Sequence, residues 1–211
     1  MYVGRKEVAI GDPQRVIAPV PAEASHGFGE ALKRSGPNDL FVKPIAEALP
    51  KGSHEASLYF DRDTPYRIFT GVLFTLGQSE VSHYQLMTTS GTVSVDPPNA
   101  HGDWAKKMAE PHLGATVIVL SEGISVKARG SNIAPGCKDT GSGVAIPRKS
   151  EAQDFAALTE CLARVKAAAP EFAGEKDIII SAQPAIPVAQ IIATIDAARS
   201  SFPTVAFGLS R

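Results

Sequence analysis

The sequence has little of what marks a membrane-spanning, nucleic-acid-binding or disulfide-rich protein. Of its 211 residues, two are cysteine and one is tryptophan, and the formal net charge is −1. A chain so close to neutral lacks the basic surface that attracts nucleic acid or an anionic membrane. No apolar run approaches the roughly 18 residues of a transmembrane helix, and the first residues, MYVGRKEVAIG, contain no apolar signal-peptide core. We therefore expect a soluble polypeptide, or the soluble part of a longer one.

The motifs of familiar catalytic and metal sites are also missing. The sequence contains no G-x-S-x-G elbow, no P-loop, no G-x-G-x-x-G after a strand and no H-E-x-x-H. No two histidines have the i, i+4 spacing of a helical metal site, so we expect no metal ligand among His26, His54, His83, His101 and His112. The sequence predicts no enzyme, no catalytic residue and no cofactor.

Three weaker patterns have a simple structural explanation. The segment 26–29, HGFG, is similar to an oxyanion loop, but without a nucleophile it indicates a flexible loop. Gly141-Ser142-Gly143 does not lead into a helix with a lysine, so a turn is favoured over a phosphate cradle. The basic residues Arg129, Arg148 and Lys149 indicate a solvated surface rather than an anion site.

The two cysteines favour a disulfide. Cys137 lies in the Gly-rich turn PGCKDTGSG and Cys161 lies on a predicted helix, and neither belongs to a C-x-x-C or zinc-type spacing. The alternative is two unrelated free thiols, one exposed and one buried. An exposed loop thiol is a liability in a small protein, so we predict a Cys137–Cys161 bond and with it an oxidising compartment.

The C-terminal segment 177–211 sets the organisation of the chain. A β-branched run at 178–180 predicts a buried strand, and Pro187 suits the start of a helix. The apolar positions Val188, Ile191, Ile192 and Ile195 then follow at helical spacing, and 204–209 predicts the last strand. Residues 56–88 repeat this order and phase without a gap when they are shifted by 122 positions, which aligns Pro65 with Pro187.

The repeat predicts two tandem units, a first unit at 1–95 and a second at 115–211, separated by a linker at 96–114 in which Trp104 covers the junction. Each unit reads β-β-α-β-α-β, and two helices per small sheet imply helices on one face, so the fold class is α+β. Thr64 and Ser150 are the expected helix caps, the latter with Gln153 in a capping box. We expect the two units to pack as a pseudo-dimer.

Three C-terminal motifs resemble the ExbD/TolR family of biopolymer-transport proteins. They are the strand-like 178–182, IIISA, the helical 195–199, IDAAR, and the aromatic strand 205–207, VAF. The preceding helix, DFAALTECLARVKAAAP, is similar to the first helix of that family. The likeness covers about 115–211, and it reaches 1–95 only through the repeat.

The resemblance implies a non-catalytic periplasmic domain in the cell envelope, part of a proton-motive-force-driven protein-transport or motor complex. Its partners would be inner-membrane motor subunits and a periplasmic protein or peptidoglycan, bound by protein–protein interaction such as strand addition at a sheet edge. This sequence departs from the family in lacking the N-terminal transmembrane helix with its aspartate, so membrane association would require a segment or subunit outside this chain.

A second hypothesis is a cytoplasmic small-molecule-binding α/β protein or enzyme that uses the Gly-rich loop 136–143. A cleft with convergent titratable groups at that loop would favour it. A third is a structural periplasmic adaptor that binds the cell wall without a deep site.

Overall fold

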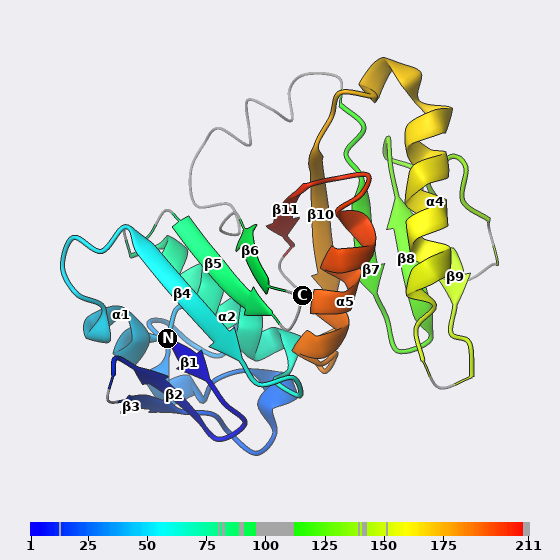
Figure 1. Ribbon diagram of the computed structural model, residues 1–211. Helices are drawn as coiled ribbons and strands as arrows, with labels where there is room; N and C mark the ends of the chain where they lie inside the picture. Colours follow the sequence, from blue (N-terminus) through cyan, green and yellow to red (C-terminus); the bar gives the residue numbers. More distant parts are fainter. Residues whose placement is uncertain are drawn as a thin grey trace.

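The computed structural model describes residues 1–12, 14–79, 81, 83–88, 91–95, 112–138, 140, 143–150 and 152–208. In these residues the chain is α+β, with a six-stranded and a five-stranded mixed sheet and four α-helices (Figure 1). Most of the predicted linker, including Trp104, lies outside the described residues. The described end of that linker, Leu113, is buried, and its backbone N–H donates to the Glu175 carboxylate over 2.7 Å.

The first sheet is built from residues before 96 and has the order β3-β2-β1-β4-β5-β6. Strands β1, β4 and β5 are parallel, and the remaining neighbours are antiparallel. Its strands are β1 (Tyr2–Val3), β2 (Glu7–Ile10), β3 (Arg15–Pro19), β4 (Glu55–Phe60), β5 (His83–Thr88) and β6 (Gly91–Val95). Its helices are α1 (Lys43–Ala48) and α2 (Tyr66–Gly77), with short 3-10 turns at Ala24–His26 and Glu30–Leu32.

The second sheet begins after the predicted linker and has the order β11-β10-β7-β8-β9. Strands β7, β10 and β11 are parallel, and β8 and β9 continue the sheet antiparallel. Its strands are β7 (Thr116–Val119), β8 (Gly123–Lys127), β9 (Ile146–Pro147), β10 (Asp177–Ala182) and β11 (Thr204–Phe207). Its helices are α4 (Phe155–Ala168) and α5 (Val188–Ala198), with a 3-10 turn at Pro170–Phe172.

The two sheets share one strand order when β6 is set aside. In each, three strands and a helix precede a central strand, and a second helix leads to a strand parallel to it. The central strands β4 and β10 span 55–60 and 177–182, so both of their ends differ by the 122 positions read from the sequence. Helices α2 and α5, which follow them, begin at Tyr66 and Val188, again 122 apart.

Several local expectations are corrected. The first half has three strands before its first helix rather than the predicted two, because β1 has two residues and gives no periodic signal. In the second half the sequence also predicts a short strand at 144–146, and the structure has β9 at Ile146–Pro147. In sheet order the hairpin β7–β8 matches β1–β2. Helix α4 is capped by Asp154, whose carboxylate accepts the Ala157 N–H over 3.0 Å, while Ser150 sits at φ 61° outside the helix.

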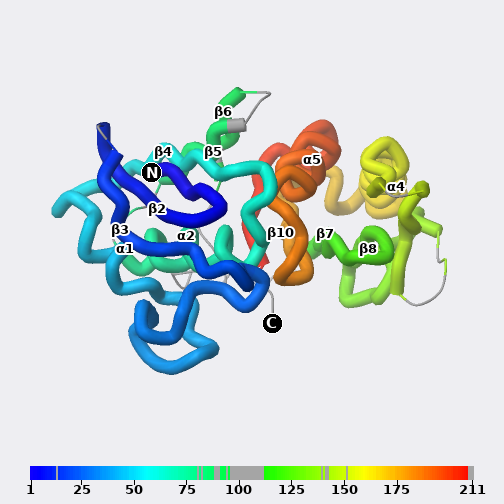
Figure 2. The backbone as a smooth tube through the Cα atoms, turned by 90° about the horizontal axis from the view of Figure 1, so that it is seen from below, coloured from blue at the N-terminus to red at the C-terminus, as the bar shows by residue number. Residues whose placement is uncertain are grey.

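The core is one cluster that draws buried apolar residues from both sheets and all four helices. In the first sheet Leu58 is fully buried under α2, while Tyr59, its neighbour on the opposite face, is 48% exposed. The two helices of each half lie on the same side of their sheet (Figure 2). This arrangement agrees with the expected one-faced covering of a sheet by two helices.

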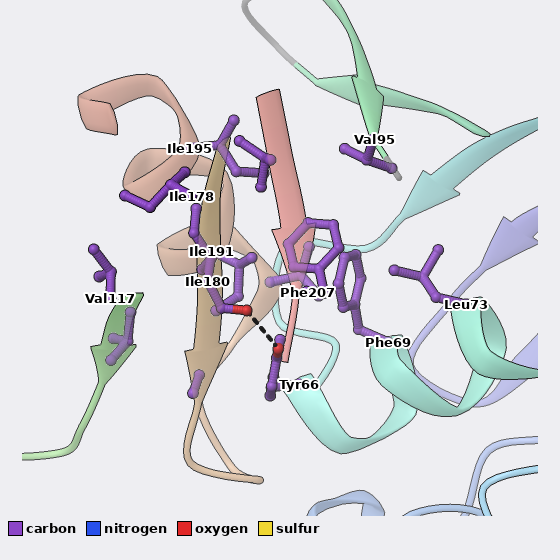
Figure 3. Packing of buried hydrophobic residues seen from close by; sticks show 14 of the residues in the cluster. Tyr66, Phe69, Leu73, Val95, Val117, Ile178, Ile180, Ile191, Ile195 and Phe207 are labelled. Carbon is purple, nitrogen blue, oxygen red and sulfur yellow. Dashed lines mark hydrogen bonds between the residues drawn. The ribbon is translucent and has the colours of Figure 1, made fainter. Parts of the chain in front are cut away.

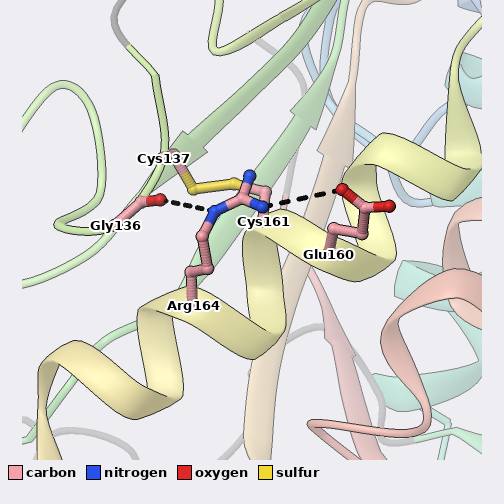
Figure 4. Close-up of a disulfide and its surroundings, with 5 residues drawn as sticks. All are labelled: Gly136, Cys137, Glu160, Cys161 and Arg164. Carbon is pink, nitrogen blue, oxygen red and sulfur yellow. Dashed lines mark hydrogen bonds and ion pairs between the residues drawn. A yellow bond between two sulfur atoms is a disulfide. The ribbon is translucent and has the colours of Figure 1, made fainter.

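The Cys137–Cys161 disulfide is present and confirms the predicted pairing (Figure 4). It joins the loop after β8 to α4, with a Cα–Cα distance of 5.1 Å. Beside it, the Arg164 Nε donates to the Gly136 carbonyl over 2.8 Å, and the Arg164 guanidinium lies 3.6 Å from the Glu160 carboxylate. Gly136 has φ 90° and a side chain there would lie 2.8 Å from the Arg164 carbonyl oxygen, so this close approach requires glycine.

We expect loss of the disulfide to lower the free energy of unfolding by about 3 kcal/mol, because the bond closes a loop of 24 residues in the unfolded chain. The Cys137→Ala/Cys161→Ala double variant and the wild type would be unfolded with urea, each with and without dithiothreitol. Dithiothreitol should bring the wild type to the stability of the double variant and leave that variant unchanged. Equal stability of all four samples would contradict the expectation.

Candidate functional site

The two halves meet where their equivalent helices begin. The Tyr66 N–H donates to the Ile186 carbonyl over 2.7 Å, and the Val188 N–H donates to the Thr64 carbonyl over 2.8 Å. Donors and acceptors of these two bonds are both 122 positions apart, so each half makes the same contact to the other. The structure also pairs Pro65 with Pro187 in an isolated antiparallel bridge.

A second pair of hydrogen bonds across the junction is also related by the 122-residue shift. The Arg67 N–H donates to the Pro184 carbonyl over 3.1 Å, and the Ala189 N–H donates to the Arg62 carbonyl over 2.9 Å. The first N–H groups of an α-helix have no acceptor within their own helix. Here the caps are Pro65 and Pro187, which make no side-chain hydrogen bond, so carbonyls of the other half satisfy both helix starts.

The structure corrects the predicted N-cap of α2. Thr64 is not the N-cap of α2: Pro65 is, and Thr64 is fully buried with its carbonyl engaged in the junction. The carbonyl of Arg62, two residues before Thr64, is also a junction acceptor. The sequence feature that could have indicated the junction roles of Thr64 and Arg62 is the alignment of Pro65 with Pro187.

Tyr66 is the central polar side chain of the junction (Figure 3). It is fully buried, and its hydroxyl lies 2.6 Å from the Gly208 carbonyl oxygen and 3.1 Å from that of Ile180, both in the other half. Burial raises the pKa of the Tyr66 phenol, so the group remains a protonated donor at neutral pH. Phe69 packs edge-on against Phe207 with ring centroids 4.8 Å apart.

The first sheet ends in an edge strand that no other described strand pairs with, β3 (Figure 1). Within the described part of the chain the other sheet ends are less accessible, because β6 and β11 contact each other and β9 has two residues. β3 has five residues, and its Val16 is 54% exposed, the most exposed large apolar side chain described. A register shift between Val8 and Ala9 and the terminal Pro19 limit continuous pairing on this edge.

A basic hollow adjoins the end of β3. Its volume is about 680 Å³, and it is lined by Arg5, Lys6, Val20 and Ala22. The Arg5 guanidinium lies 3.7 Å from the Asp63 carboxylate, an exposed pair that contributes little to stability. An extended chain laid along β3 would therefore meet an exposed valine and then two cationic side chains.

A second, larger groove of about 890 Å³ lies beside the disulfide, between the 136–149 segment and α4. It brings together two of the three basic residues singled out in the sequence, Arg148 and Lys149, and adds Lys138 and Arg164. Arg129 is separate, because its guanidinium pairs with the Glu171 carboxylate over 2.8 Å. Of the Gly141-Ser142-Gly143 turn, residues 141 and 142 lie outside the described residues.

Two of the described histidines are neighbours, because the His83 N–H donates to the His54 carbonyl over 3.0 Å. His26 lies 3.4 Å from the Glu23 carboxylate at an exposed site, and His101 is outside the described residues. Across the described ranges, no group of three or more His, Cys, Asp and Glu side chains is placed to hold a metal ion. No helix in that part of the chain has the length and apolar character required to cross a bilayer.

Replacing Tyr66 with phenylalanine should lower the free energy of unfolding by about 1–2 kcal/mol, because it removes a buried donor and leaves the Gly208 carbonyl unsatisfied. Urea unfolding at neutral pH would measure the change. Tyr59→Phe is the matched control: its ring is exposed, and we expect a change within about 0.5 kcal/mol. If both variants had the wild-type stability, the Tyr66 bond would not contribute to the junction.

Comparison with known proteins identified no relative of this chain. A scan of protein-family models, a search of curated proteins and a search of solved structures each returned no match for this chain. The functional argument therefore depends on the junction, the β3 edge, the disulfide and the groove described above.

Proposed function

We propose that this chain is a non-catalytic periplasmic interaction module of a proton-motive-force-driven membrane transport or motor complex, similar to the ExbD/TolR proteins. The main support is the placement of the segments that carry the resemblance. Residues 178–182 lie on β10 and 205–207 on β11, its parallel neighbour, and the helical motif at 195–199 lies on and just after α5 between them.

Two further observations support the proposal. Lys166 lies in the helix that resembles the family's first helix. Its ammonium donates to the Ala173 carbonyl over 3.1 Å and lies 4.7 Å from the Phe202 ring centroid. These contacts fix the segment that leads from α4 to β10. The Cys137–Cys161 disulfide is consistent with an oxidising, non-cytoplasmic compartment, of which the periplasm is the one we propose. Anchoring to the membrane and energy coupling would come from a partner subunit or from a segment outside this chain.

We infer that the two halves act as an internal pseudo-dimer of tandem units. The four hydrogen bonds across the junction form two pairs related by the 122-residue shift, as in an isologous interface between identical subunits. The common strand order of the two sheets supports the same interpretation. In this proposal one chain supplies both sides of an interface for which related modules need two chains.

An internal pseudo-dimer should be monomeric in solution, because the surface that would pair two chains is already occupied. Size-exclusion chromatography with light scattering at micromolar concentration should give the mass of one chain. A stable dimer whose interface, mapped by hydrogen exchange, included 62–67 and 184–189 would contradict the proposal. A dimer formed through other surfaces would leave the junction intact and would be identified as such by the same exchange map.

The proposed binding element is the β3 edge, to which an extended segment of a periplasmic partner protein would add as a further strand. Main-chain hydrogen bonds would supply affinity, Val16 would contact an apolar side chain, and the hollow with Arg5 and Lys6 would accept an acidic one. Such a site needs no deep pocket and no catalytic group.

A photo-crosslinking residue at position 16, in cells of the source organism, should capture a discrete protein of the inner-membrane complex or the periplasm, identified by mass spectrometry. The same residue at the exposed Lys176 of the second half is the control and should not capture that protein. Combining the crosslinker with Ile17→Pro, which removes a donor from β3, should reduce the yield at least about tenfold. Equal capture at both positions would contradict a β3 site, and capture of peptidoglycan fragments would favour the wall-binding alternative.

The second candidate function is small-molecule binding at the loop 136–143. One observation favours it: the groove of about 890 Å³ lies at this loop and is lined by several titratable groups. The disulfide in the groove wall supports an extracytoplasmic binding protein rather than the cytoplasmic version of this hypothesis.

A further inference from the structure

The groove beside the disulfide is lined by both apolar and charged residues. The apolar part of the lining includes the Cys137–Cys161 bond, Ala145, Ile146 and Ala157. Six charged side chains line it, and with four cations and two anions they carry a formal net charge of +2, although the whole chain carries −1. These six are Lys138, Arg148, Lys149, Arg164, Asp154 and Glu160.

Both carboxylates are already engaged within the protein. Glu160 lies 3.6 Å from the Arg164 guanidinium, and Asp154 accepts the Ala157 N–H as the cap of α4. For Lys138, Arg148 and Lys149, the described residues provide no carboxylate within 4.0 Å. Among the described residues, three of the four cations that line the groove therefore have no carboxylate partner.

The walls that carry these cations are held in place by the fold. The disulfide and the bond from Arg164 to Gly136 fix the loop against α4 (Figure 4). On the other wall, the Arg148 guanidinium donates to the Ser121 carbonyl over 3.1 Å. A site with fixed walls loses less conformational freedom when a ligand binds.

We propose that this groove binds a small organic polyanion that bears phosphate or carboxylate groups. Its volume falls within the usual range for small-molecule sites, roughly 300–1,000 Å³, which suits a metabolite-sized ligand rather than a macromolecule. Guanidinium and ammonium groups bind both oxyanions through charge-assisted hydrogen bonds, and the apolar lining residues would contact the carbon skeleton. This site is distinct from the β3 edge, so it stands whether or not the partner-binding proposal holds.

Isothermal titration calorimetry of the oxidised protein at low ionic strength would test the proposal with two probes, pyrophosphate and citrate. We expect one binding site with a dissociation constant below about 1 mM for at least one probe, weakened by added salt. Preference for one probe would identify phosphate or carboxylate as the recognised group. Failure of both probes to bind would overturn the proposal.

The Arg148→Gln/Lys149→Gln variant should bind the successful probe at least about tenfold more weakly, because two of the four cations that line the groove are lost. Lys43→Gln/Lys51→Gln removes the same charge from exposed positions of the first half and is the matched control. Thermal unfolding would establish that both variants are folded. Equal weakening in both variants would mean that the anion responds to overall charge, and it would overturn the assignment to this groove.

Discussion

Two helices that begin after a proline impose the main constraint on this structure. The backbone N–H groups of a first helical turn need acceptors, and neither Pro65 nor Pro187 provides a side-chain cap. The acceptors come from the other half of the chain. Carbonyls of Pro184 and Ile186 accept from the start of α2, and those of Arg62 and Thr64 accept from the start of α5. In the folded chain each half therefore supplies acceptors for donors that the other half buries, and the same junction lies within a hydrophobic cluster that draws residues from both halves.

The junction determines which surfaces remain accessible. It brings β6 and β11 into contact, and it buries Tyr66, Phe69 and Phe207 between the sheets. Strands β3 and β9 are thereby left at the two far ends of the molecule (Figures 1 and 2). The β3 edge and the groove beside β9, for which we propose different ligands, are in consequence separate surfaces.

The sequence predicted the elements whose signal is periodic and local. Residues 83–88 predict a strand, and β5 has these bounds, while β4, β10 and α5 agree with the expected elements within a residue or two. The apolar positions of these elements alternate or recur at helical spacing. Strand β1 was missed, because two residues carry no period and its pairing is set by tertiary contacts, whereas β9 overlaps the short strand predicted at 144–146. The disulfide was predictable, whereas the convergence of Lys138, Arg148, Lys149 and Arg164 was not, because 26 residues separate the first and last of them and the folding of the loop onto α4 brings them together.

The additions to the common strand order fall in different places in the two halves. The first sheet gains β6, which covers the β11 side of the junction, and the second gains a disulfide-bound loop that walls a groove. The shared elements β4, β10, α2 and α5 are those that make the junction, and a change there would disturb both halves. Additions at the periphery leave the reciprocal bonds untouched, so each half can acquire a binding surface of its own without loss of the common core.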